Sequence, residues 1–232
     1  MCPPTPNLNY DPEIHHRRSI RLRGYDYSHA APYFVTICVQ DHICLFGDVV
    51  DGEMVLNNAG LMIQRWWNEL EKKFPGVGLD TFRVMPNHLH GILVIMGTGM
   101  DMVAMFGIGL DGLDIESADA NEGIVPSRDG TMGGHIGPPL QPCLGDIIQW
   151  FKTMTTNEYI REVRESGWPR FKGKLWQRDY FDHIVRNAES LDRIREYIRD
   201  NPLRWSLDRE NPDREGDDEF DQWLLDQESD EL

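Results

Sequence analysis

Short apolar runs alternate with longer segments of helical spacing along most of the chain. Four of the short runs are rich in β-branched and aromatic residues, which is typical of strands. The predicted strands cover residues 32–40, 78–85 and 88–96 and a segment near 180–186. Three longer segments repeat apolar residues every three or four positions, which predicts helices. The predicted helices cover residues 58–74, 144–165 and 188–201.

Turn-forming and capping residues mark where these elements begin and end. Asp51-Gly52 lies between two short apolar runs and predicts a hairpin over residues 46–56. Asn187 is a suitable N-cap for the last helix, and Pro202 ends that helix. The resulting order is strand, helix, strand, strand, helix, strand, helix. This order predicts an α+β fold of the ferredoxin-like, split β-α-β type, with an antiparallel sheet and helices packed mainly on one face.

Two segments depart from this pattern and carry the acidic charge. Residues 97–140 hold 10 of the 21 glycines and a net charge of −6, and residues 206–232 hold a net charge of −10. Together they account for the whole net charge of −16. We therefore expect a basic arm over residues 1–31, a domain over 32–205 that is interrupted by a flexible, glycine-rich insertion at 97–140, and an acidic tail with a weak helix around 220–225.

The distribution of charge keeps nucleic acid among the candidate partners. A strongly negative net charge by itself argues against such a partner, but the remaining segments are neutral overall and their bases cluster. The clusters are Arg17, Arg18, Arg21 and Arg23, and Arg170, Lys172, Lys174 and Arg178. No run of roughly 18 apolar residues exists to span a bilayer, the N-terminus lacks the pattern of a secretory signal, and the four cysteines form no C-x-x-C pair. We expect a cytoplasmic protein with reduced thiols that associates with the nucleoid when it binds DNA.

His88 and His90 are the first candidates for chemistry. Residues i and i+2 of a strand share a face, so both imidazoles point the same way and Leu89 points to the other face. Two imidazoles on one strand can hold a metal ion from a rigid platform. The alternative is that both histidines only form hydrogen bonds with nearby backbone.

Tyr197 and Asn201 form a second pair. They are four residues apart on the last predicted helix, so they share a face beside its apolar stripe. The alternative is that Tyr197 is a core-edge residue and Asn201 a cap before Pro202. Taken with the two histidines, however, a phenol and a carboxamide oxygen make a plausible site for phosphoryl transfer. A metal ion would polarise the phosphate, and the phenol, whose ordinary pKa is about 10, would attack phosphorus.

The motifs around these residues resemble a known family. VMPNHLHGILVI at residues 84–95 and REYIRDNP at 195–202 resemble the IS200-like, single-tyrosine transposases, in particular the REP-associated tyrosine transposases. These belong to the HUH endonucleases, named for a histidine–hydrophobic–histidine motif. Further matches are RRSIRL, YDYS, PYFVTICV, QWFK and LWQRDYFDHIVRN, which together cover most of residues 17–96 and 141–205.

The resemblance implies specific roles for individual residues. His88 and His90 would be metal ligands, Asn201 the third ligand, and Tyr197 the nucleophile. The cofactor would be Mg²⁺ or Mn²⁺, and mixed nitrogen and oxygen ligands suit Mn²⁺ somewhat better. The substrate would be single-stranded DNA near hairpin repeats, cleaved through a covalent 5′-phosphotyrosine with release of a 3′-hydroxyl. The acidic insertion and tail leave open a domesticated DNA-hairpin-binding protein without strand-transfer activity.

Basic and aromatic residues are candidates for contacts with that DNA. The predicted phosphate contacts are Arg17, Arg18, Arg21, Arg23, Lys152, Lys172, Lys174 and Arg178. Trp150, Phe171, Trp176 and Tyr180 could stack on unpaired bases, or they could be core aromatics. His183, in the last predicted strand, is more readily a satisfied strand residue than a proton shuttle. The sequence predicts no membrane partner and leaves open whether the protein is a monomer or a homodimer.

Overall fold

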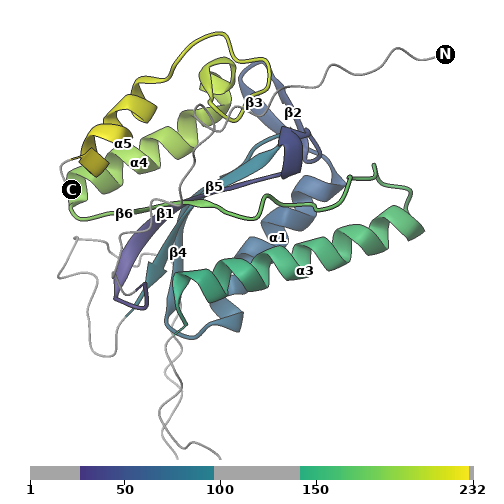
Figure 1. The fold of residues 1–232 in the computed structure, drawn as a ribbon, viewed down its shortest axis with the longest axis horizontal. Helices are drawn as coiled ribbons and strands as arrows, with labels where there is room; N and C mark the ends of the chain where they lie inside the picture. The colour runs from purple at the N-terminus through teal and green to yellow at the C-terminus, as the bar shows by residue number, and fades with distance from the viewer. Residues whose placement is uncertain (1–26, 97–141, 230–232) are drawn as a thin grey trace, which may run out of the picture.

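The computed structural model describes residues 27–96 and 142–229, and these form an antiparallel sheet with helices on both faces (Figure 1). The four main strands all pair antiparallel, in the order β4-β5-β1-β6. They are β1 (Ala31–Cys38), β4 (Val77–Val84), β5 (His88–Ile95) and β6 (Phe181–Ile184). The predicted α+β class and antiparallel sheet are therefore confirmed, but the helices cover both faces of the sheet and not mainly one, because the central strands are apolar on both faces. The histidine-bearing strand β5 lies between β4 and β1, as its apolar residues on both faces predict.

A separate hairpin accompanies this sheet. It consists of β2 (Gly47–Val50) and β3 (Glu53–Leu56), and its turn is Asp51-Gly52, as predicted. Both turn residues have positive φ, 52° and 79°, which is the conformation that two-residue hairpins favour. Between β1 and this hairpin lies a short 3₁₀ helix, η1 (Gln40–His42).

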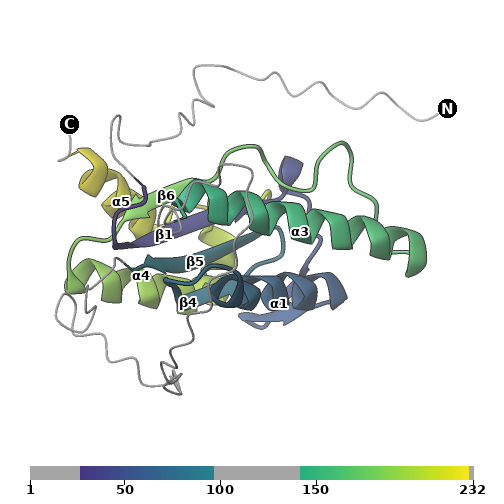
Figure 2. The ribbon, with the colours of Figure 1, turned by 90° about the horizontal axis from the view of Figure 1, so that it is seen from below.

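The two longest helices pack against one face of the sheet. They are α1 (Asn58–Lys73) and α3 (Leu144–Glu165), which lie on the side of the sheet away from α4 and α5 in Figure 1 and both extend toward the right of the view in Figure 2. Asn57 caps α1 by accepting hydrogen bonds from the backbone of Ala59 and Gly60. Between these helices and the sheet lies the larger of two hydrophobic cores, and alternate residues of β1, such as Val35, point into it.

The remaining helices cover the opposite face, on which the two histidines lie. They are α4 (Ala188–Asp200), the 3₁₀ helix η2 (Asn201–Leu207) and α5 (Glu219–Ser229). Asn187 caps α4 by accepting a hydrogen bond from the backbone of Ser190, as predicted. This smaller core includes Phe34 and Ile92 from the sheet. Both faces need helices because both faces of the central strands are apolar.

The acidic C-terminal segment packs on this second face as far as it is described. The predicted weak helix is present as α5, and its Phe220 and Leu224 are buried. Residues 1–26 of the predicted arm (1–31), the whole predicted insertion (97–140), residue 141 and residues 230–232 lie outside the described residues. No helix in the described ranges 27–96 and 142–229 has the length and apolarity that a bilayer span requires.

Candidate active site

His88 and His90 project from β5 into a fully buried cluster. Each is at most 1% exposed, and their Nε2 atoms lie 2.9 Å apart. Leu89 points to the opposite face and belongs to the larger core. The prediction that the two imidazoles share a face is confirmed, and both rings aim the same nitrogen at one point.

The neighbouring Asn87 determines which nitrogen of His88 carries the proton. Its Nδ2 donates to the backbone oxygens of His42, at 3.0 Å, and Glu210, at 2.7 Å. The amide oxygen must therefore face His88 Nδ1, which lies 2.9 Å away and donates to it. Burial lowers the pKa of His88 to about 3, and the partial offset from Asp208 does not reverse this shift. His88 is thus neutral at pH 7, with the lone pair of Nε2 directed at the cluster.

His90 is oriented from the adjacent strand. Its Nδ1 lies 2.9 Å from Thr36 Oγ1, and Thr36 is its direct partner in the pairing of β1 with β5. A hydroxyl can donate or accept, so this contact holds the ring in place without selecting its tautomer. Hydrogen bonds thus orient both Nδ1 atoms and leave both Nε2 atoms facing the same point, as in histidines that bind metal.

Asp208 brings a carboxylate to the same point. Its Oδ2 lies 3.7 Å from His88 Nε2 and 3.6 Å from His90 Nε2. Among the described residues, His88, His90 and Asp208 are the group whose geometry could hold a metal ion. Burial by itself would raise the pKa of Asp208, but the two imidazoles and the hydrogen bond from Asn201 hold it below its usual range.

Sequence reasoning missed Asp208, because it assigned the residue to the acidic tail. The carboxylate lies only seven residues after Asn201, just beyond η2. Its Oδ1 accepts a hydrogen bond from the backbone of Glu210 at 2.6 Å, so the short turn after η2 fixes its direction. The sequence holds only a weak signal for this residue, because Asp208 and Glu210 are the first acids after the predicted end of the helix at residue 201.

Asn201 lies in the cluster, but the orientation of its amide makes it a donor. It is fully buried, and its Nδ2 donates to Asp208 Oδ2 at 2.6 Å. Its Oδ1 has no hydrogen-bond partner among the described residues. A buried acceptor of this kind is costly, and rotating the amide by half a turn would exchange the two atoms. The side chain is therefore placed to offer an oxygen to a cation beside Asp208.

Tyr197 completes the cluster from α4. Its hydroxyl lies 3.4 Å from His90 Nε2, and its ring is 4% exposed. Burial raises the pKa of the phenol well above its ordinary value, and the nearby Asp208 and Asp221 raise it further. The ring of Phe220 in α5 stacks on the phenol, with centroids 3.7 Å apart and planes within 8°. The phenol is thus protonated and covered by the C-terminal helix.

The predicted DNA-contacting residues do not form one group: Lys152 is engaged within the fold, three others are exposed, and the rest are not described. Lys152 donates to the backbone oxygens of three consecutive residues, 177–179, so it holds the segment before β6. Lys172, Lys174 and Arg178 lie exposed on the connection from α3 to β6 and form no ion pair with a described residue. The four predicted arginine contacts of the N-terminal arm, Arg17, Arg18, Arg21 and Arg23, lie outside the described residues.

Of the four candidate aromatics, Trp176 belongs to the core, and Trp150, Phe171 and Tyr180 are half-buried and pack against it. Trp176 is 4% exposed, and its indole donates to Thr155 Oγ1. Trp150 is half-buried and packs edge-on against Trp66. His183 lies in β6 directly opposite Phe34, on the face of the cluster but two residues along β1 from Thr36. Burial lowers its pKa to about 4.

The fold and the cluster together define an α+β protein with two histidines, a carboxylate and a tyrosine buried on one face of an antiparallel sheet. No protein-family model matches the chain. The chain is 33% identical, over 205 residues, to an uncharacterized protein of Haemophilus influenzae strain Rd, with 86% of this chain and 96% of the relative covered. The chain therefore belongs to the same family as this Haemophilus influenzae protein.

Two solved structures are similar to the chain. One is a REP-associated tyrosine transposase bound to a REP hairpin, with a TM-score of 0.44 and 14% identity, over 80% of this chain and 73% of that one. The other is a transposase candidate from Deinococcus radiodurans R1, with a TM-score of 0.39 and 13% identity, over 77% of this chain and 95% of that one.

Proposed function

We propose that the protein is a metal-dependent DNA transposase or endonuclease. It would cleave and rejoin single-stranded DNA near hairpin repeats through a covalent 5′-phosphotyrosine at Tyr197. The observation that carries this proposal is the convergence of His88, His90, Asp208 and the Tyr197 hydroxyl at one buried point. These residues come from β5, from the turn after η2 and from α4, so their meeting is not a local effect of the sequence.

The residues at this point fit a divalent cation. Two ligands at about 2.1 Å from a cation and at right angles to each other lie about 3.0 Å apart, and the two Nε2 atoms are 2.9 Å apart. We propose His88, His90 and Asp208 as ligands, with Asn201 Oδ1 as a further oxygen after rotation of its amide. Nitrogen and oxygen donors together suit Mn²⁺. When bound there, the cation would polarise a phosphate oxygen and stabilise the phenolate of Tyr197.

The side chains of the cluster have complementary roles in this reaction. The Tyr197 hydroxyl gives up its proton to solvent, Oη forms the bond to phosphorus, and the bond to the 3′-oxygen breaks. That oxygen leaves with the electron pair and takes up a proton, while the 5′-phosphate stays on the tyrosine. Attack by a 3′-hydroxyl on this phosphotyrosine reverses the step and rejoins the strand. Asn87 and Thr36 orient the two imidazoles throughout.

Covalent capture of DNA tests the proposal. The purified protein is mixed with labelled single-stranded hairpins and Mn²⁺, and denaturing electrophoresis then separates any covalent adduct. Wild type should form an adduct that Tyr197→Phe abolishes while hairpin binding is retained. His88→Ala should weaken adduct formation or change its metal requirement. An adduct that persists in Tyr197→Phe would assign the nucleophile to another residue.

One observation favours a second candidate function, a domesticated hairpin-binding protein. The stacking of Phe220 on Tyr197 keeps the phenol away from solvent in this structure. If wild type binds hairpins but forms no adduct with any of a broad set of them in Mn²⁺, this second function is favoured over strand cleavage.

A further inference from the structure

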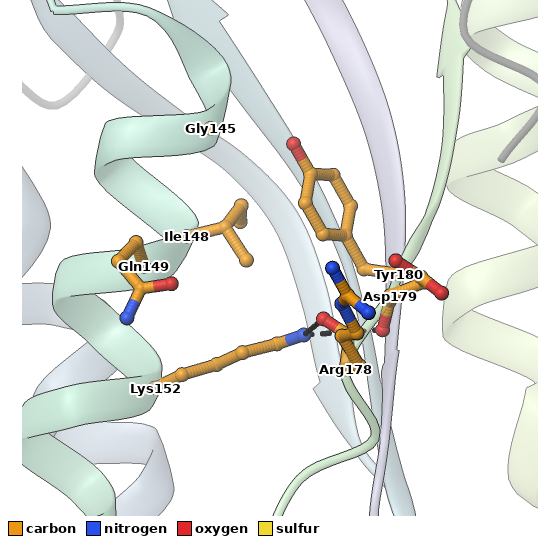
Figure 3. A pocket seen from close by; sticks show the side chains of 7 residues that line it. All are labelled: Gly145, Ile148, Gln149, Lys152, Arg178, Asp179 and Tyr180. Carbon is orange, nitrogen blue, oxygen red and sulfur yellow. Dashed lines mark hydrogen bonds between the residues drawn. The ribbon is translucent and has the colours of Figure 1, made fainter.

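A pocket lies between α3 and the segment that leads into β6, away from the histidine cluster. Its volume is about 440 Å³, within the range of roughly 300–1,000 Å³ of small-ligand sites. One wall is α3, with Ile148 and Gln149, and the other is residues 178–180 (Figure 3). The Lys152 side chain crosses from the first wall to the second and closes one end.

The charged groups that line this pocket are two cations, Lys152 and Arg178, and one carboxylate, Asp179. The Lys152 ammonium is already bonded to the backbone oxygens of residues 177–179 and lies 5.3 Å from the centre of the Tyr180 ring. The charges of the other two groups, Arg178 and Asp179, are opposite in sign. A phosphate would meet that carboxylate and a lysine that is already engaged. A flat, neutral group with donors and acceptors on its edge fits better.

The surroundings of the pocket indicate which flat group this is. The chain that leads to it, residues 166–178, holds four bases and no acid. Arg170, Lys172 and Lys174 are exposed on that stretch. Basic side chains that follow a backbone, next to an aromatic ring, are the usual components of a site for single-stranded nucleic acid.

The pocket and the proposed active site lie on opposite faces of the sheet, and β6 connects the two. Tyr180 immediately precedes β6, and Phe181 pairs with Thr36, which in turn pairs with His90. Two strand spacings, about 10 Å, therefore separate the start of β6 from the histidine-bearing strand. β6 is the edge strand of the sheet, so a nucleotide chain can pass around this edge between the two sites.

We infer that this pocket binds one unpaired base of the single-stranded DNA substrate. The base stacks on Tyr180, its edge contacts Gln149 and Asp179, and the neighbouring phosphates contact the basic stretch. This inference rests on the proposed function for its substrate class, and it adds a base-binding site to which the cluster of histidines does not contribute.

The test compares intact and base-deleted DNA. The probe is a fluorescein-labelled DNA hairpin with thymidine tails, together with a series in which one tail position at a time is abasic. The variants are Tyr180→Leu, which keeps apolar packing against Lys152, and Gln149→Ala, at an exposed helix position. Asn157→Ala, exposed further along α3, is the matched control. Fluorescence anisotropy gives Kd, and circular dichroism confirms that each variant is folded.

Removal of the stacking ring should weaken binding of the intact probe about tenfold, and Gln149→Ala should weaken it less. Asn157→Ala should bind as wild type does. With one particular abasic position, wild type should bind as weakly as Tyr180→Leu, and the variant should lose nothing more. The inference is overturned if Tyr180→Leu and Gln149→Ala both bind the intact probe as tightly as wild type does. It is also overturned if the affinity of these variants falls by the same factor on every abasic probe, so that no single tail position accounts for the loss. Failure of wild type to bind any hairpin would instead overturn the proposed function together with it.

Discussion

Replacement of Asp208 by Asn tests the metal centre directly. The change removes one negative charge from a point where Asp208 Oδ2 lies within 3.7 Å of both Nε2 atoms. It should leave the metal-free fold nearly intact. The oxygen of the new side chain can still accept a hydrogen bond from the backbone of Glu210. Its NH₂ group can donate to Asn201 Oδ1, which lacks a partner among the described residues, once the Asn201 amide rotates by half a turn. We expect the free energy of unfolding without metal to fall by about 1 kcal/mol or less.

The metal affinity should respond much more strongly. Loss of groups that merely support a ligand costs about 10–100-fold in affinity, so loss of a ligand charge should cost at least about 100-fold. At a Mn²⁺ concentration near 100 times the wild-type Kd, binding stabilises wild type by about 2.7 kcal/mol. The variant, with a Kd about 100-fold higher, would gain only about 0.4 kcal/mol. At about 2–4 °C per kcal/mol, wild type should gain about 5–11 °C in Tm and the variant about 1–2 °C.

The assay is thermal unfolding with and without Mn²⁺, supported by calorimetric titration of Mn²⁺. Glu215→Gln, an exposed change of the same charge, is the control and should respond as wild type does. An Asp208→Asn variant that gains as much Tm from Mn²⁺ as wild type would refute the assignment of Asp208 as a ligand. If Asn201→Ala lost the response instead, the third ligand would be the one implied by the family resemblance.

Three further results are expected. Phe220→Ala should uncover Tyr197 and return the pKa of its phenol toward 10, as ultraviolet absorbance titration would show, and an unchanged titration would contradict the role of α5 as its cover. Burial lowers the pKa of His88 to about 3 and that of His183 to about 4, so the stability due to keeping them neutral is complete above about pH 6.5. It should decline as pH falls toward these values, by up to about 1.4 kcal/mol per pH unit for each histidine, and urea unfolding of His183→Asn should show a shallower decline. Gly91→Ala should destabilise the fold by about 1–3 kcal/mol in the same urea assay, because the added Cβ would clash with the ring of Trp67 in α1.

The local elements of the fold could be predicted because each depends on residues close in sequence. The run of apolar residues in 88–96 predicts a strand, and the two-residue period of any strand places His88 and His90 on one face. The turn at Asp51-Gly52 and the cap at Asn187 are equally local, and both are present as predicted. The helical spacing of Tyr197 and Asn201 places them on one face of α4 and its continuation in the same way.

Contacts between distant parts of the chain could not be predicted in this way. The placement of Asp208 beside the histidines depends on how η2 and its following turn return over β5, and no periodicity encodes that path. The same is true of Phe220 on Tyr197 and of Lys152 beneath residues 177–179. Composition suggested solvated charge for the acidic C-terminal segment and for the basic residues near 152–178. Tertiary packing decided which of their polar groups became buried and paired.

The sequence by itself thus determined the strands, the helices and the pairing of two imidazoles on one face, because backbone periodicity is a local property. Only the tertiary structure decided that an acid from the C-terminal segment meets those imidazoles and that an aromatic ring of α5 covers the tyrosine. Such encounters are set by the packing of whole elements against both faces of the sheet, where burial selects partners regardless of their separation in the chain.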